Sequence, residues 1–456
     1  MSDGPRGIPG DGLDEPPGAR QAVSVVLPVL LDGDPGAGPD PDAGPDPDAG
    51  PEPDADPDAG PDWQRGPLPF GPEQRPWDAE RRGRYYAPAA ARALYGRRWH
   101  RRASVTRGPL ELEGVELLRV AMPREPRQAF GILHFTVRGV PLLAVLRAIG
   151  HRPGAGPDPL TGALDPAALF HGVADTAPPR APFALARPYT VAFLSPGTAH
   201  TAVLRDADGR LPAGADRRLR ALAWRAAEAD NPSTPERVDA VSAEAIRISA
   251  DWSALVYRHG TAFLGHRPDQ GPGDFYEFAA VQARAVYLDA LLLGMVQRDH
   301  LDALADELST VFDTAPGLAR RVSALEQNIA VFRSAHWRRH QTVHGPADGL
   351  LRAFQAQHRL PELFTDILAE AADYSRIVQT RESQQIAGAL GVLTVLGLPL
   401  GTALSVLQVL GDESPWHLLI ALTAALAATA AALTTRYGRL VLASLRGTPR
   451  RDRRRD

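Results

Sequence analysis

Three histidines spaced four residues apart are the first candidates for chemistry in this sequence. His336, His340 and His344 would share one face of a helix, and two histidines at that spacing can bind a transition metal. No carboxylate lies where it would complete an obvious site, and His336 also continues an apolar seam. We therefore favour a structural or solvated role for these residues over metal binding.

A second candidate is acidic. Asp299, Asp302 and Asp306 recur at helical spacing and would form an acidic face on one helix. Such a face is usually solvated surface, and this is the interpretation we favour. The alternative is that these carboxylates bind Mg²⁺ between subunits, since oxygen ligands suit that ion.

Other catalytic chemistry has little support in the sequence. The chain has no cysteine, which excludes disulfides, thiolate metal sites and cysteine nucleophiles. We find no Gly-rich phosphate loop, Ser-centred elbow or paired-carboxylate motif. The formal net charge of −4 provides no overall field that would attract nucleic acid. We therefore expect neither an enzyme nor a nucleic-acid-binding protein.

One segment, residues 81–107, is strongly basic and has aromatic residues interleaved. This pattern is typical of an anion-binding face. The plainer interpretation is a solvated helix face that balances an acidic tract or lies near anionic lipid headgroups. The basic residues are Arg81, Arg82, Arg84, Arg92, Arg97, Arg98, Arg101, Arg102 and Arg107, and the aromatic ones are Tyr85, Tyr86, Tyr95 and Trp99.

Two uncharged apolar segments near the C-terminus, 386–410 and 416–435, are each long enough to cross a bilayer. The five-residue connection 411–415 has two acids and no basic residue, which predicts an antiparallel hairpin. Arg376 and Arg381 precede it and an Arg-rich tail, 436–456, follows it. Because basic flanks stay on the cytoplasmic side, we expect a multi-pass protein of the cell membrane with both termini in the cytoplasm.

The first of these segments has a polar side. On a helical wheel its small and polar residues fall within one sector, opposite a side of large apolar residues. Two interpretations compete, namely close helix packing through Gly-x-x-x-Gly and the lining of a pore for partly hydrated ions. The sector contains Gly391, Thr394, Gly397, Gly401, Thr402, Ser405 and Gln408, and the loop acids Asp412 and Glu413 would lie at its outer mouth.

The remaining organisation predicts an α+β membrane protein with a cytoplasmic mixed α/β domain. We expect disorder at 1–21, a strand at 22–31, and a disordered Pro/Asp-rich insertion at 32–66 that contains GPDPDA repeats. The rest of the α/β domain would occupy 67–270, a helical stalk 271–385, and the transmembrane hairpin 386–435.

Local patterns add detail to this plan. We expect strands at 114–121, 130–137, 189–194, 201–205, 246–256 and 261–264, and helices at 141–149 and 217–229. In the stalk, apolar residues alternate in steps of four and three, which is a coiled-coil period. That seam consists of Leu318, Val322, Leu325, Ile329 and Phe332.

This architecture resembles the CorA family of Mg²⁺ channels over residues 276–439. The local matches are 398–400 (Leu-Pro-Leu), 411–416 (Gly-Asp-Glu-Ser-Pro-Trp) and 287–292 (Tyr-Leu-Asp-Ala-Leu-Leu). The resemblance implies a homopentamer whose first span lines a cation pore, with Mg²⁺ or another divalent cation as the ion.

The chain departs from the family at one important point, because the Gly-Met-Asn signature at the end of the first span is absent. Residues 408–412 read Gln-Val-Leu-Gly-Asp instead. Selectivity for Mg²⁺ therefore does not carry over. The sequence leaves two functions open, a CorA-like cation channel of altered selectivity and a non-conducting, membrane-anchored binding or signalling module.

Overall fold

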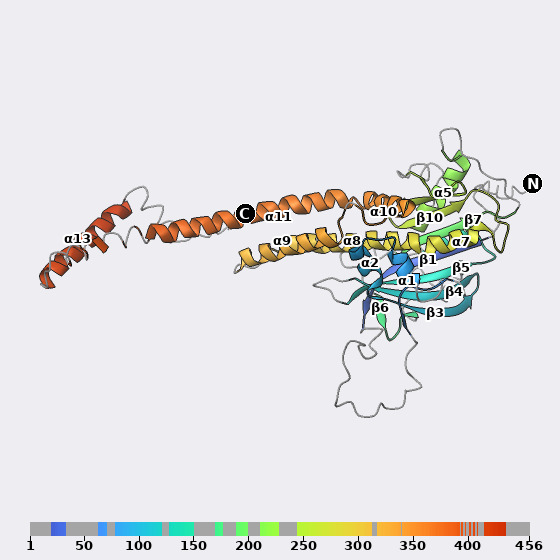
Figure 1. The fold of residues 1–456 in the computed structure, drawn as a ribbon, viewed down its shortest axis with the longest axis horizontal. Helices are drawn as coiled ribbons and strands as arrows, with labels where there is room; N and C mark the ends of the chain where they lie inside the picture. Colours follow the sequence, from blue (N-terminus) through green and yellow to red (C-terminus); the bar gives the residue numbers. More distant parts are fainter. Residues whose placement is uncertain are drawn as a thin grey trace, which may run out of the picture. The chain divides into compact units, whose positions relative to one another are not determined.

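A computed structural model of the 456-residue chain shows a mixed α/β fold with a large sheet (Figure 1). It describes residues 20–32, 63–70, 78–120, 127–149, 169–176, 188–198, 210–227, 244–311, 317–338, 340–392, 394, 397, 401, 402, 405, 408 and 415–434. These residues belong to two compact units. The first comprises Met1–Ala303 and Ala330–Phe364, and the second Leu304–Ile329 and Thr365–Asp456.

The first unit is built on a ten-stranded mixed sheet. Its order is β2-β3-β4-β5-β1-β7-β10-β9-β8, with β6 paired to β1 outside this path. All pairs are antiparallel except β7 with β10. The strands are β1 (Arg20–Leu31), β2 (Gln64–Arg65), β3 (Arg98–Arg107), β4 (Leu110–Arg119), β5 (Gln128–Val137), β6 (Ala174–Thr176), β7 (Tyr189–Ser195), β8 (Ile246–Arg247), β9 (Trp252–Tyr257) and β10 (Gly260–Gly265).

Helices cover both faces of this sheet in the first unit. α3 and α5 contact β7, and α5 also contacts β9 and β10, while α7 contacts β1 and β7, and α10 contacts β8 and β9. The described helices are α1 (Asp78–Gly83), α2 (Pro88–Tyr95), α3 (Leu142–Ile149), α5 (Ala213–Ala227), α7 (Phe275–Arg284), α8 (Val286–Ser309), α9 (Leu318–Ala335), α10 (Gly345–Gln357), α11 (Leu360–Val392) and α13 (Pro415–Thr434).

The two faces of β1 differ in chemistry because successive side chains of a strand alternate between faces. Val23 and Val25 point into an apolar core that includes Leu222 of α5 and Leu146 of α3. Ser24, between the two valines, points to the other face, where it bonds His134 of β5. One face of the sheet is therefore a conventional apolar core, and the other contains buried polar groups.

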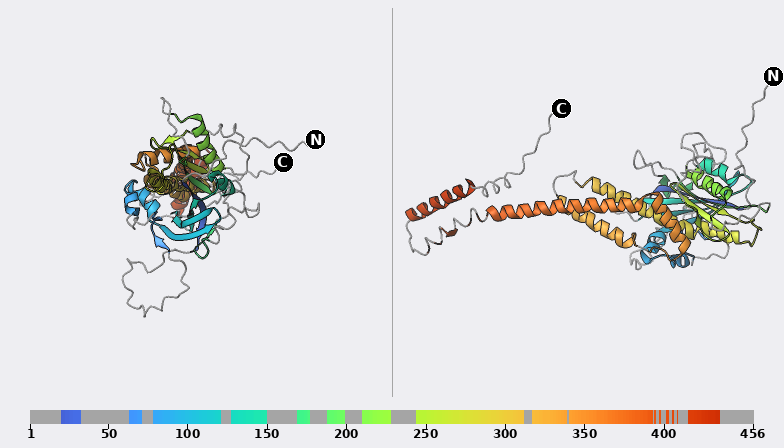
Figure 2. Two further views of the ribbon diagram at one scale, coloured as in Figure 1. Left: turned by 90° about the vertical axis from the view of Figure 1, so that its right-hand side faces the viewer. Right: turned by 90° about the horizontal axis from the view of Figure 1, so that it is seen from above.

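The second unit contains the end of α8, most of α9 and most of α11. Leu304 and Leu308 of α8 are buried, as are Val322 and Leu325 of α9. Glu307 and Asn328 join these two helices through a side-chain hydrogen bond of 3.0 Å. α11 is an unbroken helix as far as Val392 (Figure 2). Four of the five seam positions in 318–332 are therefore buried, and Leu318 is half-buried.

The structure agrees with the mixed α/β class and with most of the expected strands. The expected strand 246–256 is interrupted, since β8 ends at Arg247 and β9 begins at Trp252. The expected strand 201–205 and part of the expected helix 217–229 lie outside the described residues. The basic segment 81–107 contains the end of α1, the whole of α2 and the strand β3. The interpretation of this segment as a helix face missed the strand.

The transmembrane hairpin is not confirmed. Among the described residues, one helical stretch, Phe275–Ser309, meets a length and hydropathy criterion for crossing a membrane. This stretch consists of α7 and α8, and 89% of its apolar 18-residue portion is buried inside the protein. Burial of this kind is typical of a core helix. The segments 386–410 and 416–435 both include residues outside the described ones, so this search does not cover them in full.

A close helix–helix approach in the first unit generates a test of this packing. A Cβ atom at Gly294 of α8 would lie 2.5 Å from the Phe354 ring of α10, whereas one at Gly349 would meet Ile246 at 3.5 Å. We expect Gly294→Ala to lower the free energy of unfolding by about 1–3 kcal/mol because the packed core cannot accept the methyl group.

Gly349→Ala is the matched control, since it makes the same change in a helix with ordinary contact distances. Because alanine has the higher helix propensity, we expect it to leave stability unchanged or raise it by up to about 1 kcal/mol. Chemical denaturation followed by circular dichroism measures both. Equal stabilities for the two variants would contradict the close approach.

Candidate functional site

Six positions on the polar side of segment 386–410 are exposed in the single chain. Thr394 and Gly397 have π-helical backbone, and the other four positions are α-helical. The exposed positions are Thr394, Gly397, Gly401, Thr402, Ser405 and Gln408.

The Thr394 hydroxyl shows what this side offers chemically. Thr394 Oγ1 donates to the carbonyl oxygen of Leu390 at 2.8 Å. Because that bond uses the single hydroxyl proton, only the oxygen lone pairs remain for other partners. At Gly401 a Cβ atom would meet no described residue within 4 Å, so the space beside this position is open with respect to the described part of the chain. The loop acids Asp412 and Glu413 lie outside the described residues.

The histidines do not share a helix face. α9 ends at Ala335, so His336 lies in the following turn, His340 in an irregular segment and His344 at the start of α10. His336 packs against His300 with ring centroids 4.6 Å apart. Among the described residues no group of three or more His, Asp or Glu side chains could hold a metal ion. The expectation of a shared face was wrong because the helix ends before His336.

The acidic face is also only partly realised. Asp299 is buried and accepts hydrogen bonds from Gln128 of β5 and from Arg298. Asp302 and Asp306 are exposed. A solvated-surface role is therefore wrong for Asp299, which serves the packing of α8 against the sheet instead.

The largest polar feature of the first unit is a buried charge network centred on Asp289 of α8. Arg82 of α1 donates to both Asp289 oxygens, at 2.9 and 2.8 Å, and Tyr95 of α2 donates at 2.7 Å. Arg98 of β3 donates to Asp289 Oδ1 at 2.6 Å and also bonds Glu116 of β4. Two arginines of the basic segment are thus buried ion-pair partners, and the solvated-face interpretation is wrong for them.

The network extends across the sheet to β5 and β1. His134 Nε2 bonds Glu116 Oε1 at 2.9 Å, and His134 Nδ1 bonds Ser24 Oγ at 2.8 Å. The order Ser-His-Glu matches that of a catalytic triad. All three side chains are completely buried, however, so no substrate reaches the serine in this conformation. We assign the trio to the structural network.

Burial and charge shift the pKa values in this network. Burial raises the pKa of Glu116, but Arg98 and His134 more than offset it, so the pKa lies well below its usual range. Burial lowers the pKa of His134, which outweighs its bond to Glu116. The stable state is therefore a neutral histidine beside an ionised glutamate.

Sequence patterns could have signalled part of this network. Asp289 is the single charged residue between Arg284 and Arg298, within the apolar first half of α8. Charged side chains are almost never fully buried without a partner. A lone acid in such a run therefore predicts a buried cation, although its identity requires the fold.

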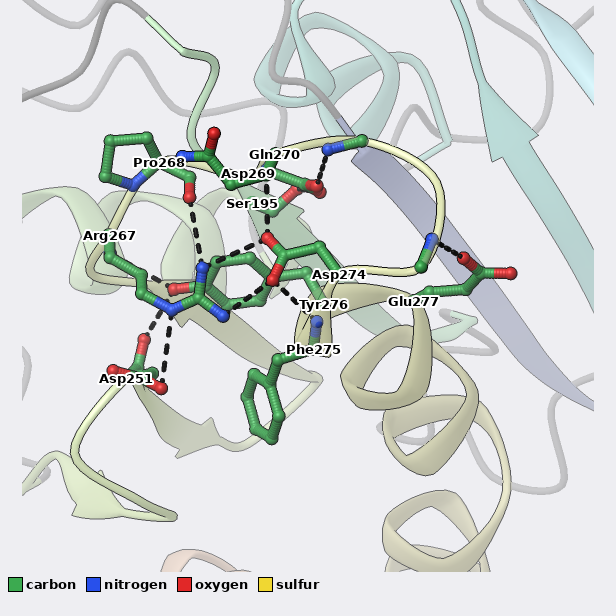
Figure 3. Close-up of polar contacts among 12 residues, drawn as sticks. Ser195, Asp251, Arg267, Pro268, Asp269, Gln270, Asp274, Phe275, Tyr276 and Glu277 are labelled. Atoms are coloured by element: carbon green, nitrogen blue, oxygen red, sulfur yellow. Dashed lines mark hydrogen bonds and ion pairs between the residues drawn. The ribbon is translucent and has the colours of Figure 1, made fainter.

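A second polar cluster fixes the start of α7 (Figure 3). Arg267 donates to Asp274 through both terminal nitrogens, at 3.1 and 2.7 Å, and its guanidinium lies 4.9 Å from the centre of the Tyr276 ring. Asp274 also accepts from the backbone N–H of Phe275 and so caps α7. Its pKa falls to about 2, chiefly because of Arg267.

The same loop is tied to the ends of two central strands, β1 and β7. Asp269 accepts from Ser195 Oγ at 2.7 Å and from Arg20 Nε at 3.2 Å. Gly271 and Gly273 have φ values of +95° and +80°, which side-chain-bearing residues rarely adopt. The charges of this cluster are matched internally, so we interpret the loop as a rigid helix start and not as a ligand site.

Comparisons with known proteins add no relative. No family model, no curated protein and no solved structure matches this chain. The resemblance to the CorA family therefore rests on the sequence features alone and enters below as a proposal.

The Asp289 network yields a stability prediction. We expect Asp289→Asn to lower the free energy of unfolding by about 3–5 kcal/mol, because two buried guanidinium groups lose their shared carboxylate. The control is Glu80→Gln, which removes the exposed Arg84–Glu80 pair and is expected to cost less than about 1 kcal/mol. Denaturant titration of both proteins checks this, and similar losses would contradict the network's role.

Two half-buried histidines predict a pH dependence. Burial lowers the pKa of His336 to about 4, with a contribution from His300, and lowers that of His358 to about 3, with one from Arg298. In the unfolded chain the pKa of each histidine is about 6.5. Because the unfolded state binds more protons between these values, stability is complete above about pH 6.5 and decreases as the pH falls towards 4.

Replacing one of these histidines tests that assignment. We expect His358→Gln to reduce the slope of unfolding free energy against pH by about 1.4 kcal/mol per pH unit between pH 6 and 4.5. His340→Gln makes the same change at an exposed position and is the matched control. Denaturant titrations at several pH values measure the slopes, and parallel curves for wild type and His358→Gln would refute the assignment.

Proposed function

We propose that this chain is an integral protein of the cell membrane that assembles into a homo-oligomer of CorA-like architecture and conducts cations. The segments 386–410 and 416–435 would form the membrane hairpin, with both termini in the cytoplasm. The polar side of the first segment would line the pore. A pentamer and a divalent ion such as Mg²⁺ are what the family resemblance suggests.

The observation that carries this proposal is the exposure of large apolar side chains on α13. Trp416 is 67% exposed, Leu419 54% and Leu426 58%. No residue of α13 has a formal charge, and twenty residues of helix rise about 30 Å, which matches a bilayer core. Soluble single chains rarely expose apolar surface on this scale, so lipid or partner subunits are the natural cover.

Features of segment 386–410 support an oligomer around its polar side. Thr394, Ser405 and Gln408 are exposed in the single chain, and polar residues within membrane spans usually face protein or water. The open space at Gly401 leaves room for a neighbouring helix. Close packing and pore lining are compatible in a ring of helices, because each helix has one neighbour on either side and the lumen between them.

The alternative function is a membrane-anchored cytoplasmic binding or signalling module that does not conduct. It shares the fold and the hairpin with the first proposal. The absence of the Gly-Met-Asn signature favours it, whereas the polar side of the first segment favours conduction, since an anchor does not need one.

Reconstitution separates the two proposals. We expect the purified protein in nanodiscs to have the mass of an oligomer by light scattering, and liposomes containing it to pass cations above the rate of empty liposomes. A monomer would refute the pore. An oligomer without flux for any of Mg²⁺, Co²⁺, K⁺ or Na⁺ would identify the anchored module.

A pair of threonines provides the matched test of the pore lining. Thr394 and Thr423 both donate their hydroxyl to a backbone carbonyl at 2.8 Å, but only Thr394 lies on the proposed pore side. We expect Thr394→Val to lower cation flux several-fold, because an acceptor oxygen is lost from the lumen. Thr423→Val should leave flux within about twofold. Equal effects of the two substitutions would contradict the assignment of the lining.

A further inference from the structure

Arginines gather at one end of the sheet in the first unit. β1 and β4 end there, and β3 and β5 begin there, because these neighbouring strands are antiparallel. The backbone N–H of Arg119 donates to the carbonyl oxygen of Arg97 at 3.0 Å. The side chain of Arg65 donates to Gly96, the residue before Arg97, at 3.3 Å. We call the following four residues the arginine end: Arg65 of β2, Arg97 before β3, Arg119 of β4 and Arg127 before β5.

The chain segment that leaves β1 already pairs with this end. Asp32 directly follows β1, and its carboxylate lies 2.7 Å from the Arg127 guanidinium. Residues 33–62, outside the described part of the chain, continue from there to Trp63 and β2, and they contain ten acidic residues and no basic one. We call residues 33–62 the acidic tract. Both of its attachment points therefore lie at the arginine end.

The residues nearest to Arg97 in the sequence are rich in arginine. No acidic residue occurs between Glu80 and Glu111. The side chains of Arg65 and Arg97 are exposed. A surface dense in one sign of charge attracts ions of the other sign. The arginine end therefore fits an anionic partner that carries several charges.

The acidic tract has the chemistry of such a partner. Its repeat, GPDPDA, places two prolines in six residues. Because proline has no backbone N–H, the tract cannot pair with a sheet edge as a regular strand, and charge is what it offers instead. Each exposed ion pair is weak by itself. Attachment at both ends raises the effective concentration of the tract to roughly the millimolar range, so that many weak pairs act together.

We propose that the acidic tract binds the arginine end of its own chain and excludes other polyanions from it. The described arginines form the binding surface, and the tract is its occupant. The contact neutralises a surface that would otherwise attract nucleic acid or anionic lipid. Because it lies within the first unit, it depends neither on membrane insertion nor on conduction.

The absence of cysteine allows the contact to be measured with two introduced spin labels. Ala49→Cys lies in the tract, and Ser104→Cys lies at an exposed position of β3. The labelled full-length protein is mixed with excess unlabelled protein, so that only distances within one chain contribute to the electron–electron coupling. We expect a narrow distance distribution at ~0.1 M salt and a broad one at ~1 M, where the Debye length falls from about 10 Å to about 3 Å. Equally broad distributions at both salt concentrations would overturn the inference.

Two double variants of equal charge provide the matched test of the surface. Arg65→Glu with Arg97→Glu should broaden the distribution at low salt. Arg138→Glu with Arg352→Glu makes the same change at exposed arginines elsewhere, since Arg138 follows the opposite end of β5 and Arg352 lies in α10. We expect this control to keep the narrow distribution. Equal broadening by the two variants would show that the tract responds to net charge alone, which contradicts a specific surface.

Heparin binding tests whether the tract excludes other polyanions. With the ten acids of the tract changed to their amides, we expect full-length protein to bind heparin several-fold more tightly than the wild type. Adding Arg65→Glu with Arg97→Glu should remove this gain, whereas adding Arg138→Glu with Arg352→Glu should retain most of it. The Arg-rich C-terminal tail is present in every variant and cancels in the comparison. Wild type that binds heparin as tightly as the neutralised variant would identify an external polyanion as the occupant and overturn the proposal.

Discussion

The first unit depends on one electrostatic constraint, the neutralisation of Asp289 inside the protein. Its carboxylate accepts from two arginines and a tyrosine that come from α1, α2 and β3. Removing a charge from water costs several kcal/mol unless partners replace the lost hydration. Because residues 286–297 of α8 are otherwise uncharged, this requirement determines which side of that part of the helix faces the two arginines. The partners in turn bring three separate elements against α8.

The same network explains why one face of the sheet is polar. Arg98, Glu116, His134 and Ser24 occupy one face of four adjacent strands, and each bonds the next. Valines and leucines on the opposite face pack against α3 and α5. The apolar face supplies most of the hydrophobic stabilisation, and the polar face supplies specificity, since misplaced charges are penalised far more than misplaced methyl groups.

The sequence predicted elements where a local pattern matches a local structure. β1 and β7 are β-branched or apolar runs, and the structure has strands there. β3 was missed because its arginines resemble a solvated surface, although Arg98 is completely buried. The histidine face failed for a related reason, since spacing implies a shared face only while the helix continues, and α9 ends at Ala335. Of the candidate site, the polar side of 386–410 could be read directly from a helical wheel.

By itself the sequence determined the absence of thiol chemistry, the mixed α/β class and the presence of two uncharged segments with a polar side on the first. These are properties of composition and of short-range period. Only the tertiary structure decided which charges are buried and what neutralises them. Arg82 and Asp289 are separated by 207 positions, and Arg98 and Asp289 by 191. No local period encodes such a pairing, because it arises only when distant segments exclude water from the same place.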